Sequence, residues 1–488
     1  MDFANYTRRK TVTTKVGTLC IGSDYPIRIQ TMANTSTNDI EGSLAQALRC
    51  RQAGAELLRF TTQGVREVES LRQIHEQLQA KIGESLPLVA DVHFQAGVAD
   101  EAARVVEKVR INPGNYIDPA RKFKHIDYTD AEYAAELERL RERFTAFLGI
   151  CREHKTAVRL GVNHGSLSDR IMSSYGDTPA GMVESVMEFL RVAVAEQFND
   201  IVISIKASNT RVMVDTVRLL VKQMDEEKMA FPLHLGVTEA GEGEDGRIKS
   251  AVGIGALLAD GIGDTIRVSL SEAPEAEIPV ARELRDYFAD PQSARYNGVK
   301  VECKTPPSPL GKGEEIIESK ATIYYSSDVA EWGLFQLQAA AECGRLLWDN
   351  DAKQIVLHNA HFSAEQLERL GKDILQAAGV MRYKTEFVSC PGCGRTLFGL
   401  EETIAAIKSA FREAEKEHPF LRTLKIGVMG CIVNGPGEMA DADYGYVGAA
   451  RGKVSLYEGK KCIQMNIPQE EAVERLIEYI ISTASLRE

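Results

Sequence analysis

The chain has 488 residues, of which 44% are hydrophobic and 26% are charged, and its formal net charge is −12. Single hydrophobic cores stop growing near about 250–300 residues, so this length predicts two or three domains, and the acidic balance argues against general nucleic-acid binding. No apolar run reaches the roughly 18 residues that a membrane span needs, and the first residues lack the apolar core of a signal peptide, so we expect a cytoplasmic protein.

Residues 1–289 repeat one pattern, in which a short β-rich run is followed by a polar loop and an amphipathic helical stretch. The expected strands are Pro26–Met32, Gly54–Phe60, Leu86–Asp91, Lys108–Ile111, Ala157–Val162, Asp200–Ile205, Pro232–Val237 and Asp264–Ser269. The expected helices include Asp39–Ala53, Gln95–Glu107, Pro179–Gln197 and Thr210–Gln223. Eight such units favour a closed (β/α)8 TIM-type barrel. The rival is an open doubly wound sheet, but the Gly-x-Gly-x-x-Gly turn of its dinucleotide-binding form is missing after the first strand.

Polar residues stand at or just past the ends of these strands, where barrels of this type form their active sites. They are Arg59, Asp91, His93, Arg110, Asn112, Arg159, Asn163, Lys206, Thr238, Glu239, Arg267 and Ser269. Any one of them alone is better explained by a structural ion pair or a structural histidine. Together, however, four arginines and a lysine outnumber Asp91 and Glu239. The mouth is therefore predicted to bind a substrate with more than one phosphate, because guanidinium groups bind phosphate oxygens in pairs.

The strand–helix repeat ends after Ala289, and residues 290–384 have a different character. Residues 306–313 are rich in proline and glycine and are typical of a linker. The expected elements that follow are a strand (Ala321–Ser326), a helix (Trp332–Leu347), a strand (Gln354–Leu357) and a helix (Ser363–Ala378). We interpret this region as a linker and a small α/β insert with a structural role.

Residues 385–488 carry the cysteines with informative spacing. Cys390 and Cys393 form a Cys-Pro-Gly-Cys-Gly sequence, and Cys431 follows an expected strand, Thr423–Met429, in a glycine-rich turn. A zinc knuckle is one interpretation, but structural zinc usually takes four Cys or His ligands. Three thiolates in exposed, glycine-rich backbone favour an iron–sulfur cluster, with Glu438 as a candidate fourth ligand. The other six cysteines lack paired spacing and are interpreted as small buried hydrophobes: Cys20, Cys50, Cys151, Cys303, Cys343 and Cys462.

Several long motifs resemble the 4-hydroxy-3-methylbut-2-enyl diphosphate synthase family of the non-mevalonate isoprenoid pathway. The resemblance covers about residues 8–290 and the chain from Ser389 onward. Its motifs are Arg110–Asn115, Arg159–Leu167, Leu233–Gly241, Gly261–Leu270 and Cys431–Glu438. The sequence is thus identified as a member of an iron–sulfur oxidoreductase family with a barrel and a C-terminal α+β domain.

The resemblance implies a reaction and a site. The barrel would bind 2-C-methyl-D-erythritol 2,4-cyclodiphosphate through the twelve strand-end residues, and a [4Fe–4S] cluster would be held by Cys390, Cys393, Cys431 and Glu438. Glu438 would also be catalytic, giving way to the substrate, while Glu239 would either assist proton transfer or hold a substrate hydroxyl. Two electrons would arrive from ferredoxin or flavodoxin.

The chain departs from the common two-domain form of the family by the 95 residues between positions 290 and 384. A longer plant and bacterial branch carries a second barrel-like domain there, so this insert is interpreted as a shortened one. Barrel and cluster would then act either within one chain or across a homodimer. Two rival functions stay open at this point: a phosphate-binding barrel enzyme of the pterin or aldolase type with a zinc-stabilised tail, and a non-enzymatic iron–sulfur scaffold or sensor.

Overall fold

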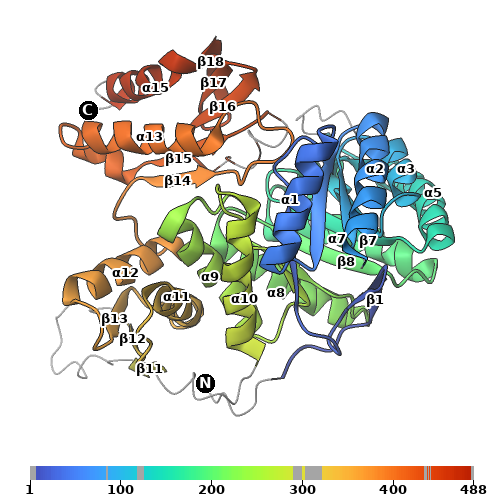
Figure 1. Ribbon diagram of the computed structural model, residues 1–488, viewed down its shortest axis with the longest axis horizontal. Helices are drawn as coiled ribbons and strands as arrows, with labels where there is room; N and C mark the ends of the chain where they lie inside the picture. The colour runs from blue at the N-terminus through green and yellow to red at the C-terminus, as the bar shows by residue number, and fades with distance from the viewer. Residues whose placement is uncertain are drawn as a thin grey trace.

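The computed structural model describes residues 7–83, 86–117, 126–289, 299–302, 321–432, 437, 439 and 441–484. Figure 1 shows three units in chain order: a barrel (blue to yellow-green), a middle unit beside it, and a C-terminal unit (orange to red). Among the described residues, the strands form a hairpin and three sheets of eight, three and five strands. None of the helices in those residues is both long enough and apolar enough to cross a membrane.

Eight parallel strands form the barrel. They are β3 (Arg28–Met32), β4 (Leu57–Thr62), β5 (Leu88–Val92), β6 (Lys108–Ile111), β7 (Ala157–Asn163), β8 (Ile201–Lys206), β9 (His234–Leu235) and β10 (Thr265–Ile266). The sheet runs from β8 through β3 to β10 and β9, and a bridge between Ile203 and Leu233 completes the ring. Each expected strand is present, and the predicted closed barrel is confirmed.

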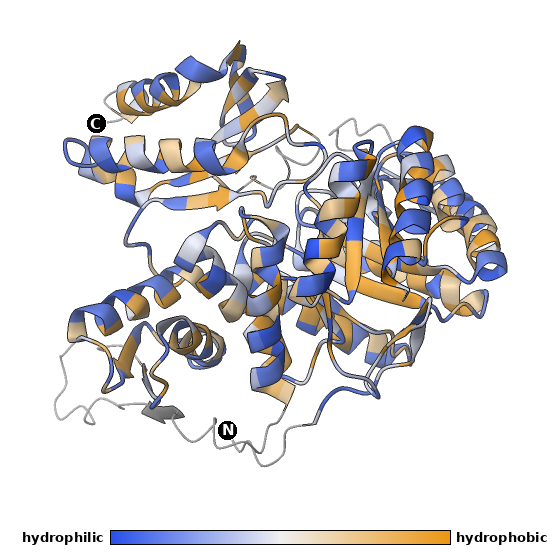
Figure 2. Ribbon diagram, in the orientation of Figure 1, coloured by the Kyte–Doolittle hydropathy of each residue, from blue (hydrophilic) through white to orange (hydrophobic). Residues whose placement is uncertain are grey.

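The barrel helices begin and end where local chemistry favours it. They are α1 (Ile40–Ala53), α2 (Val65–Ile82), α3 (Ala96–Ala103), α4 (Pro113–Tyr116), α5 (Asp130–His154), α6 (Asp169–Tyr175), α7 (Pro179–Ala195), α8 (Thr210–Glu226), α9 (Gly243–Ala259) and α10 (Pro274–Ala289). For example, the Asp39 carboxylate caps α1 by accepting from the Gly42 N–H, and Gly54 ends it with a φ of 109°. Figure 2 shows both hydrophilic and hydrophobic colours on most helices and hydrophobic colour on the barrel strands, as a buried parallel sheet requires.

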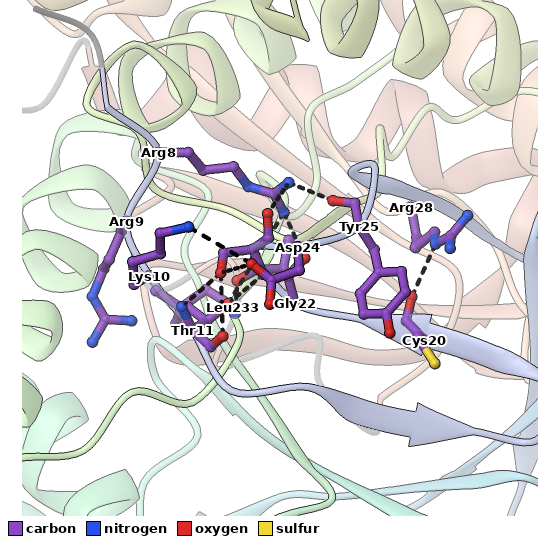
Figure 3. Close-up of polar contacts among 12 residues, drawn as sticks. Arg8, Arg9, Lys10, Thr11, Cys20, Gly22, Asp24, Tyr25, Arg28 and Leu233 are labelled. Carbon is purple, nitrogen blue, oxygen red and sulfur yellow. Dashed lines mark hydrogen bonds and ion pairs between the residues drawn. The ribbon is translucent and has the colours of Figure 1, made fainter.

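The amino-terminal end of the barrel is closed by the N-terminal segment. A hairpin of β1 (Thr14–Val16) and β2 (Leu19–Ile21) buries Val16 and Ile21 against Leu57 and Val202. Arg8 secures this segment by donating to the Tyr25 carbonyl at 2.5 Å, as Figure 3 shows. The open mouth is therefore at the carboxyl ends of the strands.

The middle unit packs against the outside of the barrel. It consists of β11 (Val299–Glu302), β12 (Thr322–Ser326), β13 (Gln354–His358), α11 (Trp332–Asp349) and α12 (Ala364–Ala377). Helix α11 lies so close to α9 that a Cβ placed on Gly255 would stand 2.5 Å from the Ala341 Cβ. The expected two strands and two helices are present, and β11 is an additional strand, antiparallel to β12, that the sequence did not predict.

The C-terminal unit is a five-stranded sheet with helices packed on it. Its strands are β14 (Glu386–Ser389), β15 (Lys425–Met429), β16 (Tyr444–Ala450), β17 (Lys453–Glu458) and β18 (Lys461–Pro468), and its helices are α13 (Leu400–Ala414), the 3-10 helix η3 (Pro419–Thr423) and α15 (Gln469–Ala484). Strands β14 and β15 are parallel neighbours, so their carboxyl ends meet at one edge of the sheet. Cys390 follows β14 directly, and Cys431 follows β15 after one glycine. This topology brings together two cysteines that are distant in the sequence.

Candidate active site

The cysteine edge of the C-terminal unit is seated on the mouth of its own barrel. The Ser271 hydroxyl, just past β10, lies 2.7 Å from the Ser389 hydroxyl and donates to the Cys390 carbonyl at 2.9 Å. Backbone also meets backbone, because a Cβ on Gly165 would stand 2.3 Å from the Gly437 carbonyl oxygen. One chain therefore forms both walls of the site.

One pocket joins the barrel mouth to the cysteine edge and is lined by residues from both units. From the barrel come Met32, Arg59, Asp91, His93, Arg110, Arg159, Asn163, Lys206, Thr238, Glu239, Arg267 and Ser269, and from the C-terminal unit come Cys390, Pro391, Gly392, Cys393, Arg395, Thr396, Met429, Gly430 and Cys431. Its walls enclose about 730 Å³, including the space open to solvent at its entrance.

Most of the strand-end residues singled out from the sequence line this pocket, but Asn112 does not. Its Nδ2 donates to the Ser166 hydroxyl at 2.9 Å, and its Oδ1 accepts from the Gly114 N–H at 3.0 Å. The structure thus places the Asn112 side chain at the start of α4, where it joins two loops of the mouth. Glu438 lies outside the described residues, as does Cys303.

The five basic side chains of the barrel wall are buried, and among the described residues acidic groups pair with two of them, Arg110 and Arg267. Within the described part of the chain, Arg59 donates to the sulfur of Met32, at 2.7 and 3.1 Å, and Arg159 donates to the Ser204 hydroxyl at 2.8 and 2.9 Å. Arg267, by contrast, is paired with Glu277 at 2.9 Å. Arg159 Nη1 and Arg110 Nε have no hydrogen-bond partner among the described residues. Buried donors of this kind are costly unless an anion binds them.

Mutual repulsion among these groups is reflected in their pKa values. Burial lowers the pKa of Arg59 to about 10, although nearby Asp91 opposes the shift. Burial, together with the charges of Arg159 and Arg59, lowers the pKa of Lys206 well below its ordinary value. A bound polyanion would reverse both shifts, because opposite charge stabilises the protonated forms.

Asp91, His93 and Arg110 form a compact group at the ends of β5 and β6. Arg110 Nη1 lies 3.1 Å from Asp91 Oδ1 and donates to His93 Nε2 at 2.6 Å. Burial would raise the pKa of Asp91, but Arg59 and Arg110 hold it well below its usual range. Burial lowers the pKa of His93 to about 3, so the imidazole is neutral. With Nε2 accepting from Arg110, the proton of His93 resides on Nδ1, which has no partner among the described residues.

Glu239 occupies a strained backbone position just past β9. Its φ is 48°, in the left-handed region that a residue with a side chain adopts at a cost of roughly 1–2 kcal/mol. The side chain is buried in the pocket beside Thr238. A conformation of this kind persists where the surroundings hold it, and here it turns a carboxyl group towards the cation-rich mouth.

The three motif cysteines lie on the opposite wall, and none of them is in a disulfide. Cys390, Cys393 and Cys431 are each half-buried. The Gly430 N–H donates to Cys390 Sγ at 3.2 Å, and burial raises the pKa of this thiol although that N–H opposes the shift. Within the described part of the chain, no three His, Cys, Asp or Glu side chains converge as a ready site for a metal ion. Three thiols at one edge, with the Gly430 N–H beside one of them, are donors that would fit an iron–sulfur group.

The remaining cysteines differ in their exposure. Cys50, Cys151 and Cys343 are buried, as expected of small hydrophobes, whereas Cys20 and Cys462 are only half-buried, and for these two that expectation is wrong. Cys20 lies on the three-residue strand β2, and Cys462 lies on the eight-residue edge strand β18; both strands are only partly buried.

Sequence reasoning assigned no role to one charged residue of the pocket, Arg395. It lies two residues past Cys393 and enters the mouth from the C-terminal unit. The sequence did contain a clue to Arg395. Because this arginine belongs to the cysteine motif, it must lie close to any site that the cysteines form. What the sequence lacks is the orientation of the motif relative to the barrel.

A closed barrel with a buried, cation-rich mouth, capped by a unit with three thiols, defines an enzyme class that handles a polyanionic substrate beside an inorganic redox group. The sequence models of the GcpE TIM-barrel domain and the GcpE protein C-terminal domain match residues 11–282 and 386–482. The chain belongs to the GcpE family.

Curated relatives align along nearly the whole chain. The chain is 47% identical to the 4-hydroxy-3-methylbut-2-en-1-yl diphosphate synthase (flavodoxin) of Bacteroides fragilis, over 622 aligned positions that cover 100% of this chain and 98% of the relative. It is 42% identical to the enzyme of the same name from Porphyromonas gingivalis, with 100% of both chains covered. Because 622 aligned positions exceed the 488 residues of this chain, at least 134 positions of the first alignment have no counterpart here.

Proposed function

We propose that this chain is a 4-hydroxy-3-methylbut-2-en-1-yl diphosphate synthase, which converts 2-C-methyl-D-erythritol 2,4-cyclodiphosphate to 4-hydroxy-3-methylbut-2-enyl diphosphate. The observation that carries this proposal is the shared pocket, in which buried, undercompensated guanidinium groups face three cysteine thiols. The first feature suits a diphosphate, and the second suits a redox group placed against it.

The barrel residues would hold the substrate through charge and hydrogen bonds. Arg59, Arg159 and Lys206 are the cations with least acidic compensation, so they would bind the diphosphate oxygens. Neutral His93 can donate from Nδ1, and Asn163, Thr238 and Ser269 offer short polar contacts around them. Arg267 is held in place by Glu277, which accepts from two of its nitrogens. A site built on strand ends positions these groups rigidly.

The cofactor would be a [4Fe–4S] cluster with Cys390, Cys393, Cys431 and Glu438 as its ligands. When bound, the cluster would supply electrons and a Lewis acid at the wall of the pocket that faces the barrel. Gly430 would stabilise the thiolate of Cys390 by the N–H that it already donates. Glu438, whose carboxylate would be a weaker ligand than a thiolate, is proposed to yield to substrate.

The overall reaction is a reductive ring-opening with loss of water. One carbon–oxygen bond to phosphate breaks, a hydroxyl leaves as water, and two electrons and two protons are consumed. Glu239 is a buried carboxyl group on the barrel side of the pocket, and it would either pass a proton to the departing oxygen or hold a substrate hydroxyl. The seated C-terminal unit excludes bulk water from the reduced intermediates.

We propose that the reaction takes place within one chain. The support is that the cysteine edge already rests on the mouth of the same barrel, through the Ser271–Ser389 contact. We also propose that the positions missing relative to the Bacteroides fragilis enzyme belong to the middle unit, whose α11 remains packed on α9. A homodimer would then be unnecessary for catalysis.

The electron donor is proposed to be flavodoxin or ferredoxin, and flavodoxin is favoured by the names of the relatives. A docking surface for an acidic electron donor would need basic residues close together. In the C-terminal unit these residues lie in two separate turns. Arg451 and Lys453 lie at the turn between β16 and β17, and Lys460 and Lys461 lie at the turn between β17 and β18. These turns are at opposite ends of β17, about 20 Å apart, so they do not form one patch. A cytoplasmic location is proposed from the sequence.

Anaerobic purification followed by iron, sulfide and zinc analysis, a visible spectrum and a turnover assay tests the proposal. About four irons and four sulfides per chain, with diphosphate product formed from the cyclodiphosphate under a reductant, are expected. Stoichiometric zinc without visible absorption would contradict the cofactor assignment. An intact cluster with no product would contradict the proposed enzymatic function and favour the rival function of an iron–sulfur sensor.

A further inference from the structure

Arg395 is the basic side chain that the C-terminal unit contributes to the pocket, and it is almost fully buried there. Only 7% of its side chain is exposed, and Nη2 lies 3.9 Å from Asp91 Oδ2, too far for a hydrogen bond. Asp91 is already engaged by Arg110 at 3.1 Å. Arg395 is therefore a weak second partner of this carboxylate.

The guanidinium of Arg395 has donor capacity left for a ligand. Its Nε has no hydrogen-bond partner among the described residues. A buried, charged group with an unused N–H is costly to keep unless an anion reaches it, and Arg395 lines the cavity in which an anion would bind.

The backbone around Arg395 is fitted to the barrel. A Cβ on Gly394 would stand 2.8 Å from the Thr35 carbonyl oxygen and 3.3 Å from the Ser36 Cα, so only glycine allows this approach. The hydroxyl of Thr396 accepts from the Cys393 N–H at 3.0 Å and shapes the same turn. These contacts set the loop against the barrel loop after β3 and direct residue 395 into the mouth.

We propose that Arg395 is a further substrate-binding residue, carried into the barrel mouth by the C-terminal unit, where it donates to the diphosphate of the substrate. Diphosphate binding and seating of the two units then strengthen each other, because the sixth basic group of the pocket is present only in the seated arrangement. Arg395 differs in this respect from the five basic groups of the barrel, which are in place without the C-terminal unit. The inference rests on the proposed function for the identity of the substrate.

Calorimetric titration of inorganic diphosphate into the anaerobic holoenzyme tests the inference. Arg395→Gln is expected to weaken binding roughly tenfold or more at low salt, the loss expected for one charge-assisted hydrogen bond, and the difference should narrow as salt is raised. Arg412→Gln, which removes the same charge from an exposed position on α13, should bind within about twofold of wild type. Equal affinity of wild type and an iron-replete Arg395→Gln variant would overturn the inference.

A measurement on the unmodified protein covers the case in which Arg395→Gln loses its iron. Hydrogen–deuterium exchange of wild-type holoenzyme should slow in the segment 390–398 when inorganic diphosphate is added. Slowing confined to the barrel strands would overturn the inference. Wild-type turnover, measured on the same sample, separates this inference from the proposed function. An active enzyme without protection of segment 390–398 contradicts only the role of Arg395. Protection of the segment without turnover contradicts the proposed reaction.

Discussion

The ammonium group of Lys249 on α9 lies 2.8 Å from the carboxylate of Glu386 on β14. This ion pair joins the barrel to the C-terminal unit, and both side chains are largely buried. Lys425 on the neighbouring strand β15 lies 3.8 Å from the same carboxylate. Glu386 is thus a single carboxylate between two lysines, at the point where β14 leads towards Cys390.

Substitution of Glu386 should destabilise the protein in a pH-dependent way. Burial would raise the pKa of Glu386, but Lys249 and Lys425 overcome it and lower the pKa to about 2. A lowered carboxyl pKa adds stability that is complete above about pH 4.5 and is lost as the pH falls towards 2. Glu386→Gln should reduce the free energy of unfolding by roughly 2–3 kcal/mol at pH 7.

Denaturant unfolding of both proteins at several pH values measures this difference, which should shrink below pH 4.5 and vanish near pH 2. The exposed residue Glu417 provides the control, because Glu417→Gln removes the same charge from the same unit without breaking this pair. A difference that stays constant down to pH 2 would show that the carboxylate charge is not its cause.

The contact between Gly165 and Gly437 should tolerate no side chain. Gly165 has a φ of 73°, and its added Cβ would stand 2.3 Å from the Gly437 carbonyl oxygen. Gly165→Ala should therefore hold the units apart and lower turnover by about tenfold or more while the circular dichroism spectrum is retained. Gly97→Ala on α3, where the added Cβ meets nothing within 4 Å, should leave turnover unchanged. Undiminished turnover in Gly165→Ala would refute a requirement for close seating.

Removal of a motif thiol should remove iron, whereas removal of another thiol should not. Cys393→Ser is expected to lose most of the roughly four irons of the wild type and the visible absorption, because a serine oxygen is a poor ligand for iron–sulfur clusters. Cys462→Ser alters a thiol of the same half-buried class on β18 and should keep its iron. Iron analysis of both variants after anaerobic purification decides the question, and equal iron in the two would contradict the ligand set.

Ligand binding should be linked to proton uptake at Lys206. Burial and the neighbouring guanidinium groups lower the pKa of this lysine in the free protein, and a bound diphosphate would raise it again. Binding therefore takes up a proton in the pH range between the two pKa values, and affinity falls as the pH rises through that range. Titrations of inorganic diphosphate in buffers of different ionisation enthalpy measure the uptake, which should decrease in Lys206→Met. Identical proton uptake in that variant would assign the effect to another group.

The barrel could be predicted from the sequence because each strand is a short β-rich run and each helix follows at a regular distance. The predicted ends of the strands are less accurate at β9 and β10, where polar residues leave the sheet. The expected strand Pro232–Val237 is reduced to His234–Leu235, and Asp264–Ser269 is reduced to Thr265–Ile266. In both cases the chain then turns into the mouth, where Thr238 stands three residues past β9 and Arg267 stands directly after β10.

The site could be predicted only within each unit. Strand-end residues of a barrel converge by topology, and Cys390 and Cys431 meet because β14 and β15 are parallel neighbours. The position of Arg395 against Asp91 depends instead on tertiary packing between residues about 300 positions apart. No local pattern encodes that packing. The same holds for Asn112, whose partner Ser166 belongs to the loop after β7.

The claim that one chain holds both walls of the active site is tested most directly by mixing two inactive variants. Cys393→Ser retains an intact barrel mouth, and Arg159→Gln retains an intact cysteine set. The two variants are mixed, unfolded together and reconstituted, and turnover of the cyclodiphosphate is then measured. If each site is formed within one chain, the turnover of this mixture stays at the level of either variant alone. Recovery to roughly a quarter of wild-type turnover, the statistical share of sites completed across a dimer, would contradict the account.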